Sequence, residues 1–138
     1  MNRTLTSFLT AGAAMLLMGT ALVAHHAESA QFDNTKPVNL KGVVKKGEWM
    51  NPHIWFYVEV TDEAGKVTTW GFSGGPPGML ARRGFTKDTL KAGDLVTVQG
   101  SRAKDGSNNA SGGRLTFADG RQVFPNAAEI ALTAPPTR

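Results

Sequence analysis

Short segments that alternate between apolar and polar residues, separated by turn residues, recur along most of this chain. The clearest alternation runs over residues 54–60, where one row contains Ile54, Phe56, Val58 and Val60. The opposite row is mixed polar and aromatic, and contains His53, Trp55, Tyr57 and Glu59. Because successive side chains of a strand point to opposite faces, this spacing predicts a β-strand with the first row in the core. The pattern favours an all-β fold.

Further strands are predicted by β-branched and aromatic residues between turn signals, over residues 38–48, 67–72, 95–100, 113–118, 121–124 and, at an edge, 129–132. Residues 79–83 allow one or two helical turns, and residues 104–113 are predicted to be a polar loop. A short helix between the third and fourth strands is the order of an OB-fold. We therefore expect a small OB-like Greek-key barrel of five to six strands with one short helix. A small β-sandwich is the alternative.

The first residues have the pattern of an export signal. Arg3 is followed by an apolar run over residues 8–18 and by small residues over 19–24. Cleavage after Ala24 and cleavage after Ala21 both fit. The apolar run falls short of the roughly 20 residues of a transmembrane helix, so no stable membrane insertion is expected after cleavage. The predicted order is a signal peptide (1–24), an extended leader (25–36), the OB-like domain (37–133) and a tail (134–138), in a periplasmic protein.

The composition narrows the function classes. With no cysteine, the chain has neither disulfides nor thiolate metal ligands. Its net charge of +4 is modest for a groove that follows phosphates, and export also argues against nucleic acid as a partner. Residues 74–78 are too rich in proline to form a phosphate-binding loop, and no serine lies in a nucleophile-elbow motif. We expect a non-enzymatic binding protein.

The three histidines suggest a metal. Cleavage after Ala24 would make His25 the N-terminus, so that its amine and ring, with His53 and His26, could bind Cu(II) through nitrogen. Met50 could add a thioether that favours Cu(I). Zinc fits less well, because structural zinc sites have four protein ligands and no carboxylate adjoins His53. Copper is the one cofactor predicted. The alternative is that His53 only caps a strand and the histidine pair begins an unstructured tail.

Aromatic and basic residues suggest a second kind of site. The residues that could contact a ligand or a partner protein of the cell envelope are Trp49, Asn51, Trp55, Tyr57, Arg82 and Arg83. Aromatic side chains on the outside of an OB barrel can stack on bases or sugars. This alternative function is an envelope protein-interaction or glycan-binding module. Trp70 and Phe72 share a face of the next strand and are interpreted as core.

Several motifs together resemble the DUF6152-type family of small exported bacterial proteins of unknown function. They are residues 25–26, 31–33, 36–38, 42–44, 48–53, 82–85 and 104–108, of which Trp49-Met50-Asn51-Pro52-His53 is the most specific. The resemblance implies an exported small β-barrel, cleaved after Ala24, and implies no activity. Members commonly continue the histidine pair with Ser-Phe, whereas this chain has Ala27-Glu28.

Overall fold

The computed structural model describes residues 29–123. The chain divides into two compact units at Gln31–Phe32, and of the first unit only a helical turn at residues 29–31 is described. None of the helices in the described part is both long enough and apolar enough to cross a bilayer. The second unit begins at Phe32.

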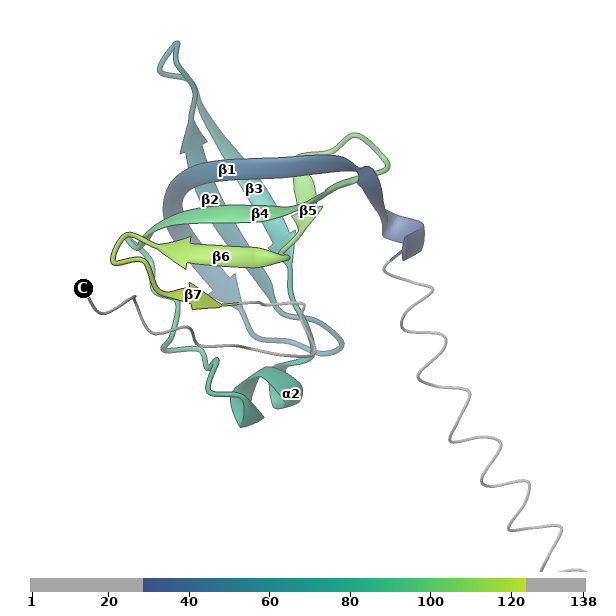
Figure 1. Ribbon diagram of the computed structural model, residues 1–138, viewed down its shortest axis with the longest axis vertical. Coiled ribbons are helices and arrows are strands. Elements are labelled where there is room, and N and C mark those ends of the chain that lie inside the picture. Colours follow the sequence, from purple (N-terminus) through teal and green to yellow (C-terminus); the bar gives the residue numbers. More distant parts are fainter. Residues whose placement is uncertain (1–28, 124–138) are drawn as a thin grey trace, which may run out of the picture. The chain divides into compact units, whose positions relative to one another are not determined.

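A closed barrel forms the body of this unit (Figure 1). Its strands are β1 (Phe32–Glu48), β2 (Trp55–Thr61), β3 (Val67–Ser73), β4 (Leu95–Ala103) and β5 (Asn109–Ser111). They pair in the circular order β1-β2-β3-β5-β4-β1, and all pairs are antiparallel except β3–β5. The outer strands β6 (Arg114–Phe117) and β7 (Gln122–Val123) continue the sheet from β4. The predicted all-β, OB-like barrel is confirmed.

Strand β1 pairs with two neighbours because it bends. Its first part, up to Val43, pairs with β4, and its second part, from Val43, pairs with β2. The register shifts between Val44 and Lys46, which marks a bulge. At Gly42 a β-carbon would lie 2.3 Å from the backbone oxygen of Glu59, so the bend brings two backbones closer than any side chain permits.

Apolar residues from both halves of the barrel fill its interior. Phe56 and Phe72 stack with ring centroids 5.3 Å apart, and Val58 and Phe72 have no exposed surface. Ile54 and Phe56 are also buried, while Val60 is half-buried against them, so the predicted core row of β2 is confirmed. Of the two aromatic residues of β3 interpreted as core, Phe72 is buried and Trp70 is half-buried.

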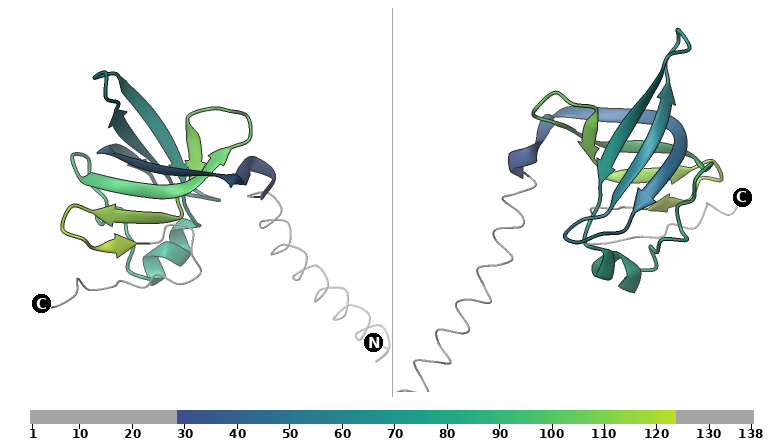
Figure 2. Two further views of the ribbon diagram at one scale, coloured as in Figure 1. Left: turned by 45° about the horizontal axis from the view of Figure 1, so that its top comes forward. Right: turned by 180° about the vertical axis from the view of Figure 1, so that it is seen from behind.

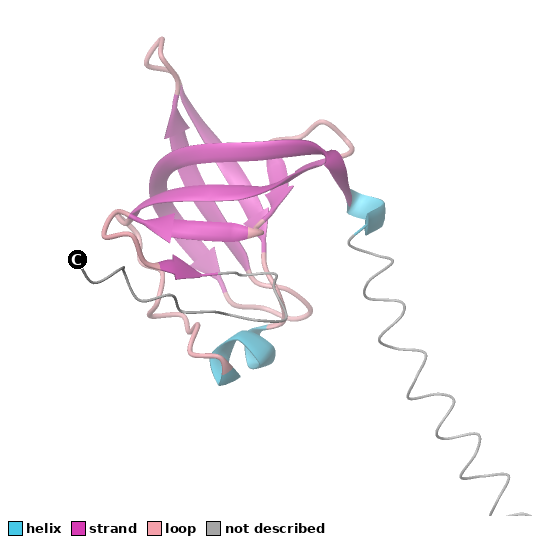
Figure 3. Cartoon of the chain, viewed as in Figure 1, coloured by secondary structure: helices cyan, strands magenta, loops and turns pink. Residues whose placement is uncertain are grey.

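The short helix α2 (Pro77–Arg82) lies at one end of the barrel, and the β2–β3 hairpin loop lies at the other (Figures 2 and 3). Prolines begin the helix, where their missing N–H costs nothing. The helix ends where Gly84 N donates to Ala81 O and Phe85 N donates to Leu80 O, the pattern of a Schellman motif. This ending turns Phe85 back beside Leu80, and both side chains are buried.

Two local predictions differ from the structure. The polar loop predicted over residues 104–113 is wrong at Asn109–Ser111, which form β5 and close the barrel against β3. Strand β1 begins at Phe32, earlier than the predicted residue 38, because Phe32 and Asp33 pair with the end of β4. The last residues of the predicted leader therefore belong to a strand. The edge strand predicted at 129–132 lies outside the described residues.

Candidate functional site

The mixed row of β2 lies on the outside of the barrel, as its spacing predicts. His53, Trp55, Tyr57 and Glu59 are all half-buried, whereas the residues between them are more enclosed. In the pairing with β3, Trp55 lies opposite Ser73 and Tyr57 lies opposite Gly71. The next strand continues these rows, with Ser111 opposite Ser73 and Asn109 opposite Gly71. An aromatic surface on β2 thus borders small polar residues on β3 and β5.

Three side chains converge over Gly71. A β-carbon at that position would lie 2.5 Å from Asn109 Oδ1, 3.3 Å from Tyr57 Cε1 and 3.5 Å from Trp55 Cζ3. The two aromatic rings and the amide oxygen therefore pack over the buried Gly71 backbone. We call Trp55, Tyr57, Gly71 and Asn109 the aromatic face. It combines flat apolar surface with a hydrogen-bond acceptor, as small-molecule sites do.

The amide of Asn109 is held in one orientation. Ser107 Oγ donates to Asp105 Oδ1 at 2.6 Å, so it accepts from Asn109 Nδ2, which lies 3.1 Å away. This leaves Oδ1 directed over Gly71, and within residues 29–123 it accepts no hydrogen bond. The aromatic face therefore has an oriented acceptor available to a ligand.

Tyr57 is fixed by two charged residues of β1. Its hydroxyl donates to Glu48 Oε2 at 3.2 Å, and Lys46 Nζ lies 4.6 Å from the centre of its ring. Lys46 also forms an ion pair with Glu48 Oε1. The positive and negative charges beside the aromatic face therefore compensate each other locally.

The ionisation of these groups follows from their contacts. The hydrogen bond from Lys46 is the main reason why the pKa of Glu48 is below its usual value, and the same contact raises the pKa of Lys46. Burial raises the pKa of the Tyr57 hydroxyl, and the Glu48 charge adds to this effect. At neutral pH Tyr57 is thus a neutral donor, Glu48 a carboxylate and Lys46 an ammonium group.

His53 lies at the Trp55 end of the same row. Its Nδ1 is 3.5 Å from the hydroxyl of Ser73, a long contact with a buried side chain. In residues 29–123 no group of three or more His, Cys, Asp or Glu side chains is placed to hold a metal ion. A copper site that includes His53 therefore needs donors from elsewhere. The other predicted donors, His25 and His26, lie outside the described residues, and Met50 is 51% exposed.

The predicted aromatic and basic residues do not form one surface. Trp49 follows the last residue of β1 and packs against the hydrophobic core, with its ring centroid 5.7 Å from that of Phe85. It borders a shallow groove of about 360 Å³ along α2, lined by Trp49, Pro77, Gly78, Ala81, Thr86 and Lys87. Arg82 is exposed on α2 and Arg83 is half-buried after it. Trp49 and Arg82 thus belong to the α2 end, separate from Trp55 and Tyr57.

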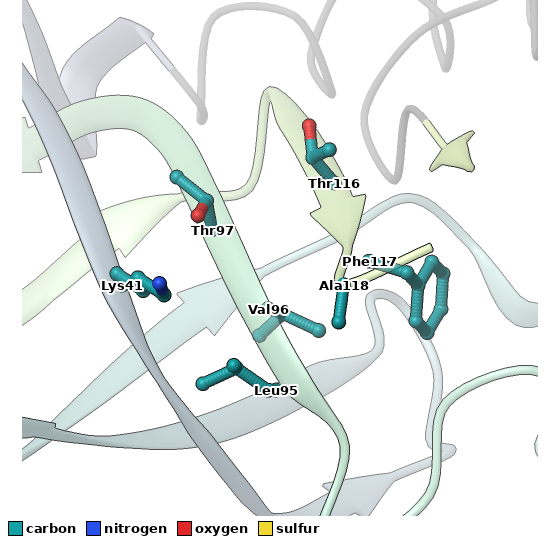
Figure 4. A pocket seen from close by; sticks show the side chains of 7 residues that line it. All are labelled: Lys41, Leu95, Val96, Thr97, Thr116, Phe117 and Ala118. Atoms are coloured by element: carbon teal, nitrogen blue, oxygen red, sulfur yellow. The ribbon is translucent and has the colours of Figure 1, made fainter. Parts of the chain in front are cut away.

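Another hollow, of about 310 Å³, lies on the outside of β4 (Figure 4). Lys41, Thr97 and Thr116 are register partners across β1, β4 and β6 and form one of its rows. Its remaining lining residues are Leu95, Val96, Phe117 and Ala118. Lys41 is the one charged residue among these. Because Trp55, Tyr57 and an oriented Asn109 amide meet on one surface, we place the candidate site on the aromatic face.

Asn109, Ser107 and Glu48 are site residues that the sequence did not suggest. Asn109 and Ser107 lie in a stretch of polar residues typical of a loop, and nothing local indicates that this stretch pairs with β3. Glu48 is in a predicted strand, but its place beside Trp55 depends on the register across the loop of residues 49–54.

Asn51 and Pro52, the rest of the most specific motif, are exposed in that loop and are joined by a cis peptide bond.

Comparison with curated proteins gave no match, and comparison with solved structures gave none either. The sequence profile of a family of unknown function (DUF6152) matches residues 14–113, which include the motif and most of the barrel. The chain belongs to this family of unknown function.

Proposed function

We propose that the protein is a non-enzymatic binding protein, exported to the periplasm, that binds a neutral sugar on the aromatic face. The observation that carries this proposal is the convergence of Trp55, Tyr57 and Asn109 Oδ1 over Gly71. Sugar rings combine apolar C–H faces with hydroxyl donors. A ring placed against Trp55 would bring hydroxyl groups within reach of the Asn109 acceptor.

The charges support a neutral ligand. Lys46 and Glu48 compensate each other, so the face offers no surplus of positive charge to a phosphate or a nucleic acid. Glu48 already accepts from Lys46 and Tyr57, and each carboxylate oxygen can accept more than one hydrogen bond. It can therefore accept a further hydrogen bond from a sugar hydroxyl at the edge of the face. The OB-fold also binds oligosaccharides in other proteins on the face of its second and third strands.

The arrangement of carboxylates supports binding without hydrolysis. Glycosidases need two carboxyl groups roughly 5–9.5 Å apart on either side of the bond that breaks. Glu48 lies opposite Trp55, while Glu59 lies four residues further along β2 and is paired with Lys45. Four residues of an extended strand span about 13 Å, so these two carboxylates lie too far apart for that chemistry.

Calorimetric titration of the mature protein with soluble neutral oligosaccharides, such as those of N-acetylglucosamine and of glucose, tests this proposal. Trp55→Ala should weaken binding of the oligosaccharide that binds by about tenfold to a hundredfold, as expected for loss of ring stacking. Asn109→Ala should weaken it by about tenfold. Leu95→Ala, which shortens an exposed side chain on the outside of β4, is the control and should bind normally. If Trp55→Ala binds the sugar as well as wild type does, the site is wrong.

Copper is the second candidate function. The half-buried ring of His53, beside the aromatic face, supports it. In this proposal Cu(II) is bound by the amine and ring of His25, by His53 and by His26, and Met50 adds a thioether for Cu(I). The site requires cleavage after Ala24. The exposure of Met50 leaves its sulfur accessible to a metal ion.

Electron paramagnetic resonance of Cu(II)-titrated mature protein, with N-terminal mass spectrometry to locate the cleavage, tests this candidate. His53→Ala, and separately one extra residue before His25, should each weaken Cu(II) binding at least tenfold. Trp55→Ala should leave it unchanged, which separates the copper proposal from the sugar proposal. Equal Cu(II) affinity in wild type and both histidine variants would rule out this set of ligands.

A further inference from the structure

The groove along α2 is a second surface that the sugar proposal does not use. Trp49 lines it together with Pro77, Gly78 and Ala81 of the helix. Small helical residues leave the groove open, because Gly78 has no side chain and Ala81 has only a methyl group. Trp49 and Pro77 are half-buried and Ala81 is exposed, so the apolar surface remains accessible to a ligand.

Two positive charges border this apolar groove. Lys87 is part of its lining, and Arg82 Nη1 lies only 3.8 Å from where a β-carbon on Gly78 would be. Among residues 29–123, Lys46 and Arg121 form ion pairs, whereas neither Lys87 nor Arg82 has an ion-pair partner there. An apolar groove with uncompensated positive charge at its border is complementary to a molecule with an apolar chain and one negative head group.

We propose that this groove binds the alkyl chain of a fatty carboxylate, with the carboxylate at Lys87 and Arg82. The chain would lie against the ring of Trp49 and along Gly78 and Ala81, where its burial supplies most of the binding free energy. The volume of about 360 Å³ lies at the lower end of the range of small-ligand sites, which suits one short alkyl chain. This proposal does not depend on the sugar site.

Three probes separate the contribution of the alkyl chain to binding from that of the negative charge. Decanoate carries both, decanol carries only the chain, and acetate carries only the charge. In titrations of the full mature protein followed by the indole N–H resonance of Trp49, decanoate should bind at least about fivefold more tightly than decanol, as expected for a charge-assisted contact. Acetate should not shift the resonance. Equal affinity for decanoate and decanol would overturn the role of the two cations.

Substitutions test the location. Ala81→Leu fills the groove from an exposed helical position and should reduce decanoate affinity at least tenfold, and Lys87→Gln should reduce it about fivefold. Lys66→Gln, at an exposed position of the β2–β3 hairpin, is the matched control and should have no effect. Unchanged decanoate binding in Ala81→Leu overturns the proposal. Absence of decanoate binding to the wild-type protein also overturns it. If such a wild-type protein forms a dimer that Ala81→Leu disrupts, the occupant of the groove is a second copy of the chain.

Discussion

Asn109 Oδ1 occupies the space above Gly71, its partner across the parallel strands β5 and β3. The backbone adds a further contact, because Gly71 N donates to Asn108 O at 2.9 Å. The strand that closes the barrel therefore also supplies the acceptor of the candidate site. Changes that disturb this closure should disturb the aromatic face as well.

Gly71→Ala tests the link between the closure of the barrel and the aromatic face. The new methyl group would be 2.5 Å from Asn109 Oδ1 and would press on the rings of Tyr57 and Trp55, so Asn109 must rotate away. We expect a loss of about 1–2 kcal/mol in the free energy of unfolding, measured by urea denaturation. The double variant Gly71→Ala/Asn109→Ala removes the clash and should recover about 1 kcal/mol relative to additivity. Strict additivity of the two single variants would contradict the close contact.

Among substitutions that add one methyl group to β1, Gly42→Ala should lower the free energy of unfolding the most. Its β-carbon would lie 2.3 Å from the backbone oxygen of Glu59, and a backbone oxygen cannot rotate aside as a side chain can. We expect destabilisation by about 3 kcal/mol, a large part of the stability of a small domain. Gly47→Ala in the same strand is the control. Its β-carbon would meet only Trp49 Nε1, at 3.8 Å, and it should change the unfolding free energy by less than about 1 kcal/mol.

Much of the barrel could be predicted because local signals agree with the final structure. In β2 the period of two separates Phe56 and Val58 from Trp55 and Tyr57, and the structure keeps that separation. The hairpin to β3 depends on a turn within a few residues, which is also a local feature. Such elements are specified by residues that are close in sequence.

The missed features depend on contacts between distant segments. Strand β5 has only one inward residue, Ala110, and its pairing with β3 joins segments about 40 positions apart, so its residues resemble a loop. The bulge after Val44 sets which residues at the end of β1 face outward, and it places Glu48 beside Trp55. Trp49, after the end of β1, packs against the core instead. The sequence groups Trp49 with Trp55, whereas the register separates them.

Protonation of Glu48 should follow its contact with Lys46. Because that hydrogen bond lowers the pKa of Glu48 in the folded state, the contribution of Glu48 to stability is present above its unfolded pKa and is lost as the pH falls through its folded pKa. NMR titration of the carboxyl group should therefore give a pKa below the usual glutamate value, and Lys46→Gln should raise it. Lys45→Gln is the control, because Lys45 pairs with Glu59. If Lys46→Gln leaves the Glu48 titration unchanged, the ion pair does not form in solution.

Arg102 should contribute to stability through its alkyl chain more than through its charge. Its guanidinium group lies 5.5 Å from the centre of the Trp70 ring and donates to Gly106 O, but its Nε is buried with no acceptor within residues 29–123. A buried donor without a partner costs about 1–3 kcal/mol, which offsets the two favourable contacts.

Arg102→Met removes the unpaired donor and keeps an apolar chain over Trp70, so it should unfold within about 1 kcal/mol of wild type in urea. Arg102→Ala removes the chain as well and should be less stable than the Met variant by about 1–2 kcal/mol, the value of one or two buried methylene groups. Fluorescence of Trp70, recorded with Trp49 and Trp55 replaced by Phe, should shift to longer wavelength only in the Ala variant, because only there does the ring become more exposed. Equal losses in both variants would assign the stabilisation to the guanidinium group instead.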